Sequence, residues 1–378
     1  MIWICCLLID HLVKRFLSAL LVFLFIVGCK SSDNLSSCEA GPGCEYASYF
    51  GIITDQDDSL KVRGVVTISP SGSSVDTLLV DSPLKRIVCM STSGVAALSA
   101  VGADSLIVAV SGLKYISDER LRARAEAGLV EDVGYDSSLD YEKIMRLKPD
   151  LIVAYLVGEV ESPYLAKLKT LGMPLMIVSD HLEQHPLARA EYVKLFGALT
   201  GRLNEARDFF DNVRNRYISL SAEGSETDQD KDGSDAGLPV KVLMNIPYAD
   251  AWYIPGVDNY MSRLVRDAGG VVLGAAEGSA SGVVTIEKAY RLSQQADMWL
   301  CPGHCTTIGQ LESIHHLFPH FRPLAERLPI YNNVLRTNSA GGNDFWESGA
   351  MRPDLILDDL RHIFHDSSDS LHYFIRLQ

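Results

Sequence analysis

The most informative hydrophobic pattern in the chain lies between residues 139 and 155. Leu139, Ile144 and Leu147 recur at roughly helical spacing, and Pro149 follows directly behind them. Because proline cannot continue a helix, the helix has to end before it. The apolar run 151–154 then indicates a short buried strand that ends at an aromatic residue. The segment predicts an amphipathic helix that leads into a strand through a turn.

The same alternation of apolar runs and helical periodicity continues on both sides of this segment. In the first half we predict strands at 87–90, 107–110, 151–154 and 174–178, with helices at 95–101, 118–127 and 164–171. In the second half we predict strands at 240–245, 298–300 and 330–335, with helices at 261–267, 286–293 and 353–364. Strands that alternate with helices favour mostly parallel sheets, so the fold class is α/β with two sets of elements.

A longer periodic segment separates the two sets. Apolar residues between 187 and 220 fit one long helix or two helices in tandem. Gly201 is the weak point, because glycine costs about 1 kcal/mol in a helix interior. An unbroken helix of roughly 30 residues would be about 45 Å long, which suits a rigid strut between two lobes.

These patterns divide the chain into segments. The polar stretch 30–60 is interpreted as a tether, and the β-like runs 62–68 and 77–80 as a hairpin or an edge addition before the main domain. We assign a signal peptide at 1–28, tether and β extension at 29–83, an N-terminal lobe at 84–185, a backbone helix at 186–222, a disordered acidic insertion at 223–238, a C-terminal lobe at 239–366 and a tail at 367–378.

The N-terminus has the features of a targeting segment. Lys14 and Arg15 precede the apolar run 16–27, which Gly28 and Cys29 close. The run is short for a transmembrane helix and fits the apolar region of a signal peptide. Ile26-Val27-Gly28-Cys29 resembles a bacterial lipobox, in which cleavage leaves a lipidated Cys29. The alternative is a signal anchor that happens to contain a cysteine. We expect a lipid-anchored envelope protein on the periplasmic side or the cell surface.

Charge and motifs exclude several functions. The net charge of −14 and the pI of about 5.1 argue against a partner held by phosphate contacts, such as a nucleic acid. The sequence has no Gly-x-Ser-x-Gly, no His-Glu-x-x-His and no phosphate-binding glycine loop. We therefore predict no catalytic residues, no resident cofactor and no enzymatic activity.

Several short motifs occur together in a fairly specific order. They are Lys85-Arg86-Ile87-Val88, Lys148-Pro149-Asp150, Asp267-Ala268-Gly269-Gly270, Ala296-Asp297, Asp344-Phe345-Trp346-Glu347 and Arg352-Pro353-Asp354. Over about residues 84–366, this order resembles the helical-backbone (class III) substrate-binding proteins of ABC importers for iron siderophores, haem and vitamin B12. The resemblance implies two Rossmann-like α/β lobes joined by one long rigid helix. It also implies a monomer with the ligand in a cleft between the lobes and little domain closure.

The resemblance places the ligand-contacting residues on loops at the strand ends. The candidates are Ser91, Thr92, Ser93, Tyr115, Tyr155, Tyr248, Trp252, Tyr253, Gly303, His304, Phe345 and Trp346. The three hydroxyl residues fit ordinary helix capping equally well. The aromatic residues are alternatively core or rim side chains, although flat aromatic faces suit a macrocycle.

The resemblance also implies a permease and its ATPase as partners, docked through acidic residues. Glu159 or Glu161 matches the position on the first lobe and Asp258 the position on the second. We expect a solute-binding protein that delivers an iron complex or cobalamin. One alternative is a cell-surface haem or corrinoid scavenger without a permease. Another is a metal-cluster or chelatase enzyme that uses Cys301, His304 and Cys305, a set that could bind a metal.

Overall fold

The fold is described from a computed structural model. The described residues are 41, 43–55, 57–135, 138–156, 162–226, 238–248, 251–300, 303–315, 318, 327–366 and 370–378. The signal peptide, Cys29 and most of the predicted acidic insertion lie outside these ranges. Within them, the helices are all too short or too polar to cross a bilayer.

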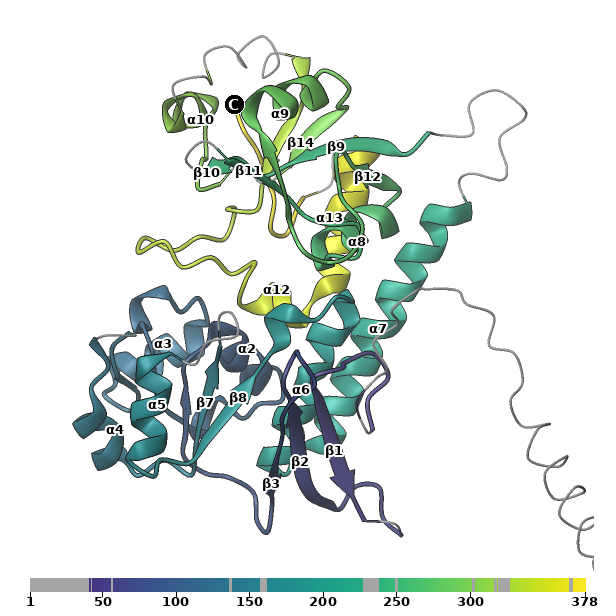
Figure 1. Ribbon diagram of the computed structural model, residues 1–378. Helices are drawn as coiled ribbons and strands as arrows, with labels where there is room; N and C mark the ends of the chain where they lie inside the picture. Colours follow the sequence, from purple (N-terminus) through teal and green to yellow (C-terminus); the bar gives the residue numbers. More distant parts are fainter. Residues whose placement is uncertain are drawn as a thin grey trace, which may run out of the picture. The chain divides into compact units, whose positions relative to one another are not determined.

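The N-terminal lobe contains a five-stranded parallel sheet (Figure 1). Its strands, in spatial order, are β6 (Glu131–Asp132), β5 (Ile107–Val110), β4 (Ile87–Cys89), β7 (Leu151–Tyr155) and β8 (Leu175–Val178). Its helices are α2 (Thr92–Ala100), α3 (Glu119–Glu126), α4 (Tyr141–Leu147) and α5 (Pro163–Thr170). Asp150, after the α4 turn, accepts hydrogen bonds from the amides of Lys85 and Arg86 and so fixes the start of β4 beside β7.

The C-terminal lobe contains a second five-stranded sheet. Its order is β12 (Gly270–Val272), β9 (Val240–Met244), β14 (Met298–Leu300), β15 (Ile330–Asn332) and β16 (Ile375–Arg376). The helices of this lobe are α8 (Tyr260–Asp267), α9 (Ile286–Ser293), α10 (Ile308–Ile314), α12 (Ser348–Met351) and α13 (Pro353–Phe364). A small antiparallel sheet of β10 (Pro247–Tyr248), β11 (Ala251–Ile254) and β13 (Gly282–Thr285) lies at its side.

The predicted tail at 367–378 is wrong for the last residues of the chain. Strand β16 pairs antiparallel with β15, and Tyr373 and Phe374 are buried. The Asp359 carboxylate on α13 accepts hydrogen bonds from the amides of residues 372, 373 and 374. The lobe therefore extends to the C-terminus. The strand escaped prediction because two residues are too few to show an alternating pattern.

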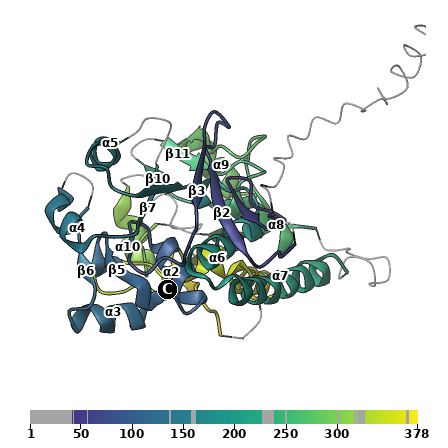
Figure 2. The same ribbon diagram turned by 90° about the horizontal axis from the view of Figure 1, so that it is seen from below.

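The predicted backbone helix at 186–222 is two helices. Helix α6 (Pro186–Thr200) ends at Gly201, whose φ of 71° is left-handed, and α7 (Leu203–Glu226) begins two residues later. The two helices pack side by side (Figures 1 and 2). The long strut is α7 alone, whose 24 residues span about 36 Å. Glycine pays little for the left-handed conformation, which is why the break falls there.

Helix α7 connects elements of both halves of the chain. Besides α6, it packs against α13 of the C-terminal lobe. Its Arg216 forms ion pairs with Asp354 and Asp358 of α13, at 3.5 and 2.6 Å. The hydroxyl of Tyr217 donates to Asp267 at the end of α8. These polar contacts fix α7 to the C-terminal lobe along its second half.

The N-terminal β extension begins earlier than predicted, within the supposed tether 30–60. Strands β1 (Phe50–Thr54), β2 (Val62–Ile68) and β3 (Val75–Leu79) form one antiparallel sheet. The fully buried Glu191 of α6 accepts hydrogen bonds from the amides of residues 45, 46 and 47, at 2.8–2.9 Å.

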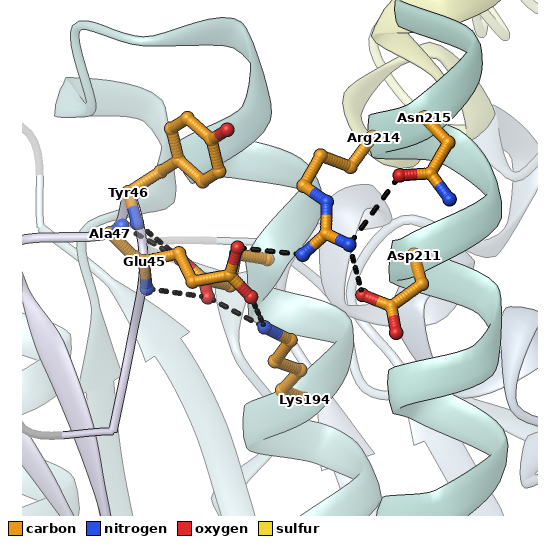
Figure 3. Close-up of polar contacts among 8 residues, drawn as sticks. Glu45, Tyr46, Ala47, Lys194, Asp211, Arg214 and Asn215 are labelled. Carbon is orange, nitrogen blue, oxygen red and sulfur yellow. Dashed lines mark hydrogen bonds and ion pairs between the residues drawn. The ribbon is translucent and has the colours of Figure 1, made fainter. Parts of the chain in front are cut away.

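Two cations also hold the N-terminal segment 45–47 in place (Figure 3). Lys194 of α6 binds Glu191 at 2.8 Å and Glu45 at 3.1 Å, and Arg214 of α7 binds Glu45 at 2.7 Å. The segment is thereby tied to both helices. Sequence patterns missed it because its stability comes from backbone amides that bind distant side chains.

Gly201 provides a test of the helix break. A Cβ there would lie 2.8 Å from Cγ of Pro83, in addition to the left-handed strain. We expect Gly201→Ala to lower the free energy of unfolding by about 2–4 kcal/mol. Gly72→Ala, at a similar φ of 67° with nothing within 4 Å, should cost only about 1–2 kcal/mol. Urea unfolding of both variants measures the difference, and equal losses would contradict a packed break.

Candidate ligand-binding cleft

A cavity of about 410 Å³ lies between side chains of the two lobes. Thr92 and Tyr115 line it from the N-terminal lobe. Asn245, Gly303, His304, Asn333, Gly341, Gly342, Asn343 and Trp346 line it from the C-terminal lobe. Most of these residues follow directly or closely after strands β4, β5, β9, β14 and β15. Carboxyl ends of parallel strands therefore face the cavity from both sheets, which is the usual ligand position in open α/β sheets.

The two lobes meet beside this cavity through a buried carboxylate. Glu347 is 2% exposed, and its two oxygens accept hydrogen bonds from the amides of Ser117 and Asp118, at 2.8 and 2.7 Å. Burial raises the pKa of Glu347 to about 7, although both amide bonds act in the opposite direction. The group joins a loop of the C-terminal lobe to the start of α3 in the N-terminal lobe.

A second contact reinforces the first. The side-chain amide of Asn338 donates to the carbonyls of Lys114 and Ile116, at 3.1 and 3.2 Å. A Cβ at Gly342 would collide with the carbonyl oxygen of Tyr115, so the two backbones touch directly there. We call the contacts of Asn338, Gly342 and Glu347 with residues 114–118 the interlobe lock.

Comparison with known proteins agrees with this geometry. Residues 87–333 match the family model described as periplasmic binding protein. The chain belongs to the periplasmic binding protein family. The resemblance found in the sequence is thereby confirmed, as is the α/β fold class.

Relatives of this periplasmic binding protein are distant. An uncharacterized lipoprotein of Methanocaldococcus jannaschii is 24% identical over 312 residues, which cover 79% of this chain and 70% of the relative. Among solved structures, a periplasmic binding protein of Veillonella parvula is 14% identical with a TM-score of 0.54, covering 85% of this chain and all of the other.

Two further solved structures are of proteins named for the ligand that they bind. A periplasmic heme-binding protein of Pseudomonas aeruginosa is 17% identical with a TM-score of 0.53, covering 78% of this chain and 98% of its own. A siderophore-binding protein of Vibrio cholerae bound to Fe³⁺-Desferal is 16% identical with a TM-score of 0.50. The match covers 75% of this chain and 99% of the other. At these identities the structures share the fold.

The cavity brings together five of the residues that the sequence nominated as ligand contacts. They are Thr92, Tyr115, Gly303, His304 and Trp346. Sequence reasoning missed the three asparagines and the two glycines at 341 and 342. Asn245 and Asn333 each come directly after a strand, so the rule that selected the other loops would also have selected them.

Two nominated aromatic residues belong to the core instead. Trp252 is fully buried, packs against Trp299 at a ring-centroid distance of 5.7 Å, and donates its indole N–H to the Met244 carbonyl. Phe345 is 1% exposed and packs against Tyr373 and Phe374. Their prediction as ligand contacts is wrong, because neither side chain reaches the cleft.

The pleat of β11 explains the case of Trp252. Side chains alternate along a strand, so Trp252 and Ile254 face inward while Tyr253 faces outward. Tyr253 is 41% exposed, and Tyr248 on β10 is 80% exposed. Both tyrosines stay predictions, since neither is among the residues that line the described cavity.

The remaining nominated residues have identifiable structural roles. The Ser91 hydroxyl caps α2 by accepting from the Gly94 amide, and Ser93 is buried with its hydroxyl 3.3 Å from that of Ser91. Tyr155 stands edge-on to His181, with ring centroids 6.1 Å apart. Capping accounts for Ser91, and Ser93 bonds to the capping hydroxyl; ligand contact by all three residues stays a prediction.

Of the three predicted docking residues, Asp258 lies in the described part of the chain. Glu159 and Glu161 lie outside the described residues. Asp258 is partly exposed and forms a long ion pair with Arg263, at 3.7 Å. A role for Asp258 in permease docking stays a prediction.

The metal-cluster hypothesis gains no support from the described residues. Cys301 lies outside them, and Cys305 is a buried free thiol whose pKa is raised by burial. Within the described ranges, no group of three His, Cys, Asp or Glu side chains is placed to hold a metal ion.

Glu347 makes the stability of the lock depend on pH. Its folded pKa of about 7 lies above the ordinary glutamate value, so the folded state holds this proton more tightly than the unfolded state. The free energy of unfolding should therefore fall as pH rises from about 4.5 to 7, by up to about 1.4 kcal/mol per pH unit.

The Glu347→Gln variant should lack this component. The Gln side chain bonds the two amides less well, which lowers the free energy of unfolding by the same amount at every pH. The slope of that free energy against pH is therefore the informative quantity. Chemical unfolding of both proteins between pH 5 and 7 measures it. Identical slopes would contradict a proton held by Glu347 in the folded protein.

Proposed function

We propose that this periplasmic binding protein captures an iron complex (a siderophore or haem) or cobalamin in the cleft between its lobes. It then delivers the ligand to an ABC permease and its ATPase. The observation that carries the proposal is the cavity of about 410 Å³ with one accessible aromatic ring from each lobe. Tyr115 and Trp346 remain 40% and 47% exposed there, so each ring offers a flat face to a ligand.

The chemistry of the cavity favours a ligand that brings its metal already chelated. The described lining residues include no Asp, Glu, Lys or Arg. A bare metal ion would require several carboxylate or thiolate ligands. Flat rings, asparagine amides and the His304 imidazole instead suit a large and mostly apolar chelate with a few polar edges. His304 is the residue best placed to reach a metal with an open axial position.

The size and neighbours are consistent with this class. The volume falls in the range of about 300–1,000 Å³ that small-molecule sites occupy. A heme-binding and a siderophore-binding protein share the fold. A relative described as a lipoprotein supports an anchor through Cys29 and a place in the cell envelope.

Trp346 is the most informative residue to change. Calorimetric titration of the wild-type protein with haemin, cyanocobalamin and ferric desferrioxamine should reveal saturable binding of at least one of them. Trp346→Ala should weaken that binding about tenfold or more, because the stacked ring area is lost. Tyr290→Ala on α9, a partly exposed aromatic residue away from the described lining, serves as control. Unchanged affinity in Trp346→Ala, or no binding of any ligand, would refute the proposal.

Delivery needs a separate test from capture. A variant with Glu159, Glu161 and Asp258 all changed to Ala should keep its ligand affinity, since the proposal gives these carboxylates a role in docking and none in the cleft. ATP-driven uptake of the bound ligand by cells should fall strongly, because the permease would lose its charged contacts. Uptake at the wild-type rate would favour the surface scavenger.

A further inference from the structure

A second cavity, larger than the cleft, lies on the other side of the interlobe lock. Its volume is about 720 Å³, and it shares no lining residue with the cavity described above. Its walls come from the end of α2, the start of α3, the loop around Arg336 and the segment from Asp344 to Arg352. The lock residues Asn338 and Glu347 line it, whereas Tyr115 and Gly342 line the cleft. The lock therefore separates two distinct cavities.

Two serine hydroxyls in this wall lack partners. Ser99 of α2 and Ser117 before α3 both line the cavity. Neither hydroxyl has a hydrogen-bond partner among the described residues, although both oxygens are inaccessible to solvent in the protein alone. Ser99 as a whole is only 8% exposed. A buried hydroxyl without a partner destabilises the protein, so the pair points to a ligand that supplies acceptors.

Four arginines line the same cavity: Arg120, Arg122, Arg336 and Arg352. The positive charges of Arg120 and Arg352 are paired with carboxylates that do not line the cavity. The partner of Arg120 is Asp104 at 3.7 Å, and that of Arg352 is Asp354 at 2.8 Å. Neither aspartate lines the cavity.

The carboxylates inside the cavity are already bound to protein donors. Glu347 uses both oxygens on the amides of residues 117 and 118. Asp118 accepts from the Leu121 amide and caps α3. Asp344 binds Nε of Arg336 at 2.7 Å and accepts from the Ser348 amide. Among the charged lining groups, Glu119 is the carboxylate left exposed to solvent.

In the described wall of the cavity, hydrogen-bond donors without a partner outnumber carboxylates without one. Arg336 uses its Nε on Asp344, and its two Nη groups make no hydrogen bond within the described ranges. Arg122 is exposed, and its guanidinium group makes no hydrogen bond or ion pair in the same part of the chain. With the two serine hydroxyls, these guanidinium groups form a set of donors around an empty volume. Guanidinium groups pair best with planar or tetrahedral oxyanions.

We propose that this second cavity binds a small molecule carrying two or more carboxylate or phosphate groups. The site is independent of the chelate cleft, because the two cavities have no described lining residue in common. Arg122 and Arg336 contact the oxyanions, and the Ser99 and Ser117 hydroxyls turn toward the cavity and donate to the buried end of the molecule. The same lock residues that hold the lobes together form one wall of the site.

Calorimetric titration of the purified, ligand-free protein tests the proposal. Citrate serves as the carboxylate probe, inorganic pyrophosphate as the phosphate probe, and acetate as the single-charge control. At least one of the two polyanions should bind at one site per chain, at least tenfold more tightly than acetate. Its affinity should fall as NaCl increases. Comparison of the two polyanions identifies the source of the oxyanions.

Variants locate the binding. Arg122→Gln should weaken the polyanion at least fivefold, and Ser99→Ala should weaken it at least threefold. Arg291→Gln, an exposed arginine on α9 with the same change of charge, should leave it unchanged. Trp346→Ala should also bind the polyanion normally, so failure of the cleft proposal would not affect this result. No saturable binding of either polyanion, or equal affinity in Arg122→Gln and Arg291→Gln, would overturn the proposal.

Discussion

The interlobe lock is the contact on which the cleft depends. Two backbone amides of the N-terminal lobe bind one buried carboxylate of the C-terminal lobe, and Gly342 brings the backbones into direct contact. Backbone groups have few alternative positions, so this joint tolerates little movement. Helix α7 adds a second connection through its ion pairs with α13. A cleft held in this way is formed before the ligand arrives, which reduces the entropic cost of binding.

The composition of the cleft wall fits the proposed role in capture. The cleft wall offers rings, amides and one imidazole but no charged side chain among its described residues. Such a wall recognises shape and polar edges, which suits capture and release of an intact molecule. Charged side chains are concentrated instead on the far side of the lock, where four arginines and four carboxylates line a larger cavity. The lock thus divides the space between the lobes into a nearly uncharged site and one lined by charged groups of both signs.

Local sequence patterns predicted much of the fold, because strands β4, β5, β7 and β14 are short apolar runs bounded by turn residues. The predictions failed where distant contacts decide the structure. Gly201 was recognised as weak, but only its contact with Pro83 and the close approach of Ala206 to Gly197 show that the chain turns back there. The cleft loops were found from strand ends and the family resemblance, yet Trp252 was misplaced because its inward direction follows from pairing with β13. Glu347 and Ser117 lie 230 residues apart, so no local pattern could reveal the lock.

The most direct test of a preformed cleft is the distance between the lobes in solution. Spin labels at Leu129 and Val283, exposed residues of the N- and C-terminal lobes, allow that distance to be measured by pulsed electron paramagnetic resonance. The measurement is made before and after saturation with the chelate that binds. The account predicts a narrow distribution whose mean moves by no more than about 1 Å. A broad distribution in the free protein, or a ligand-induced shift well beyond about 2 Å, would contradict it.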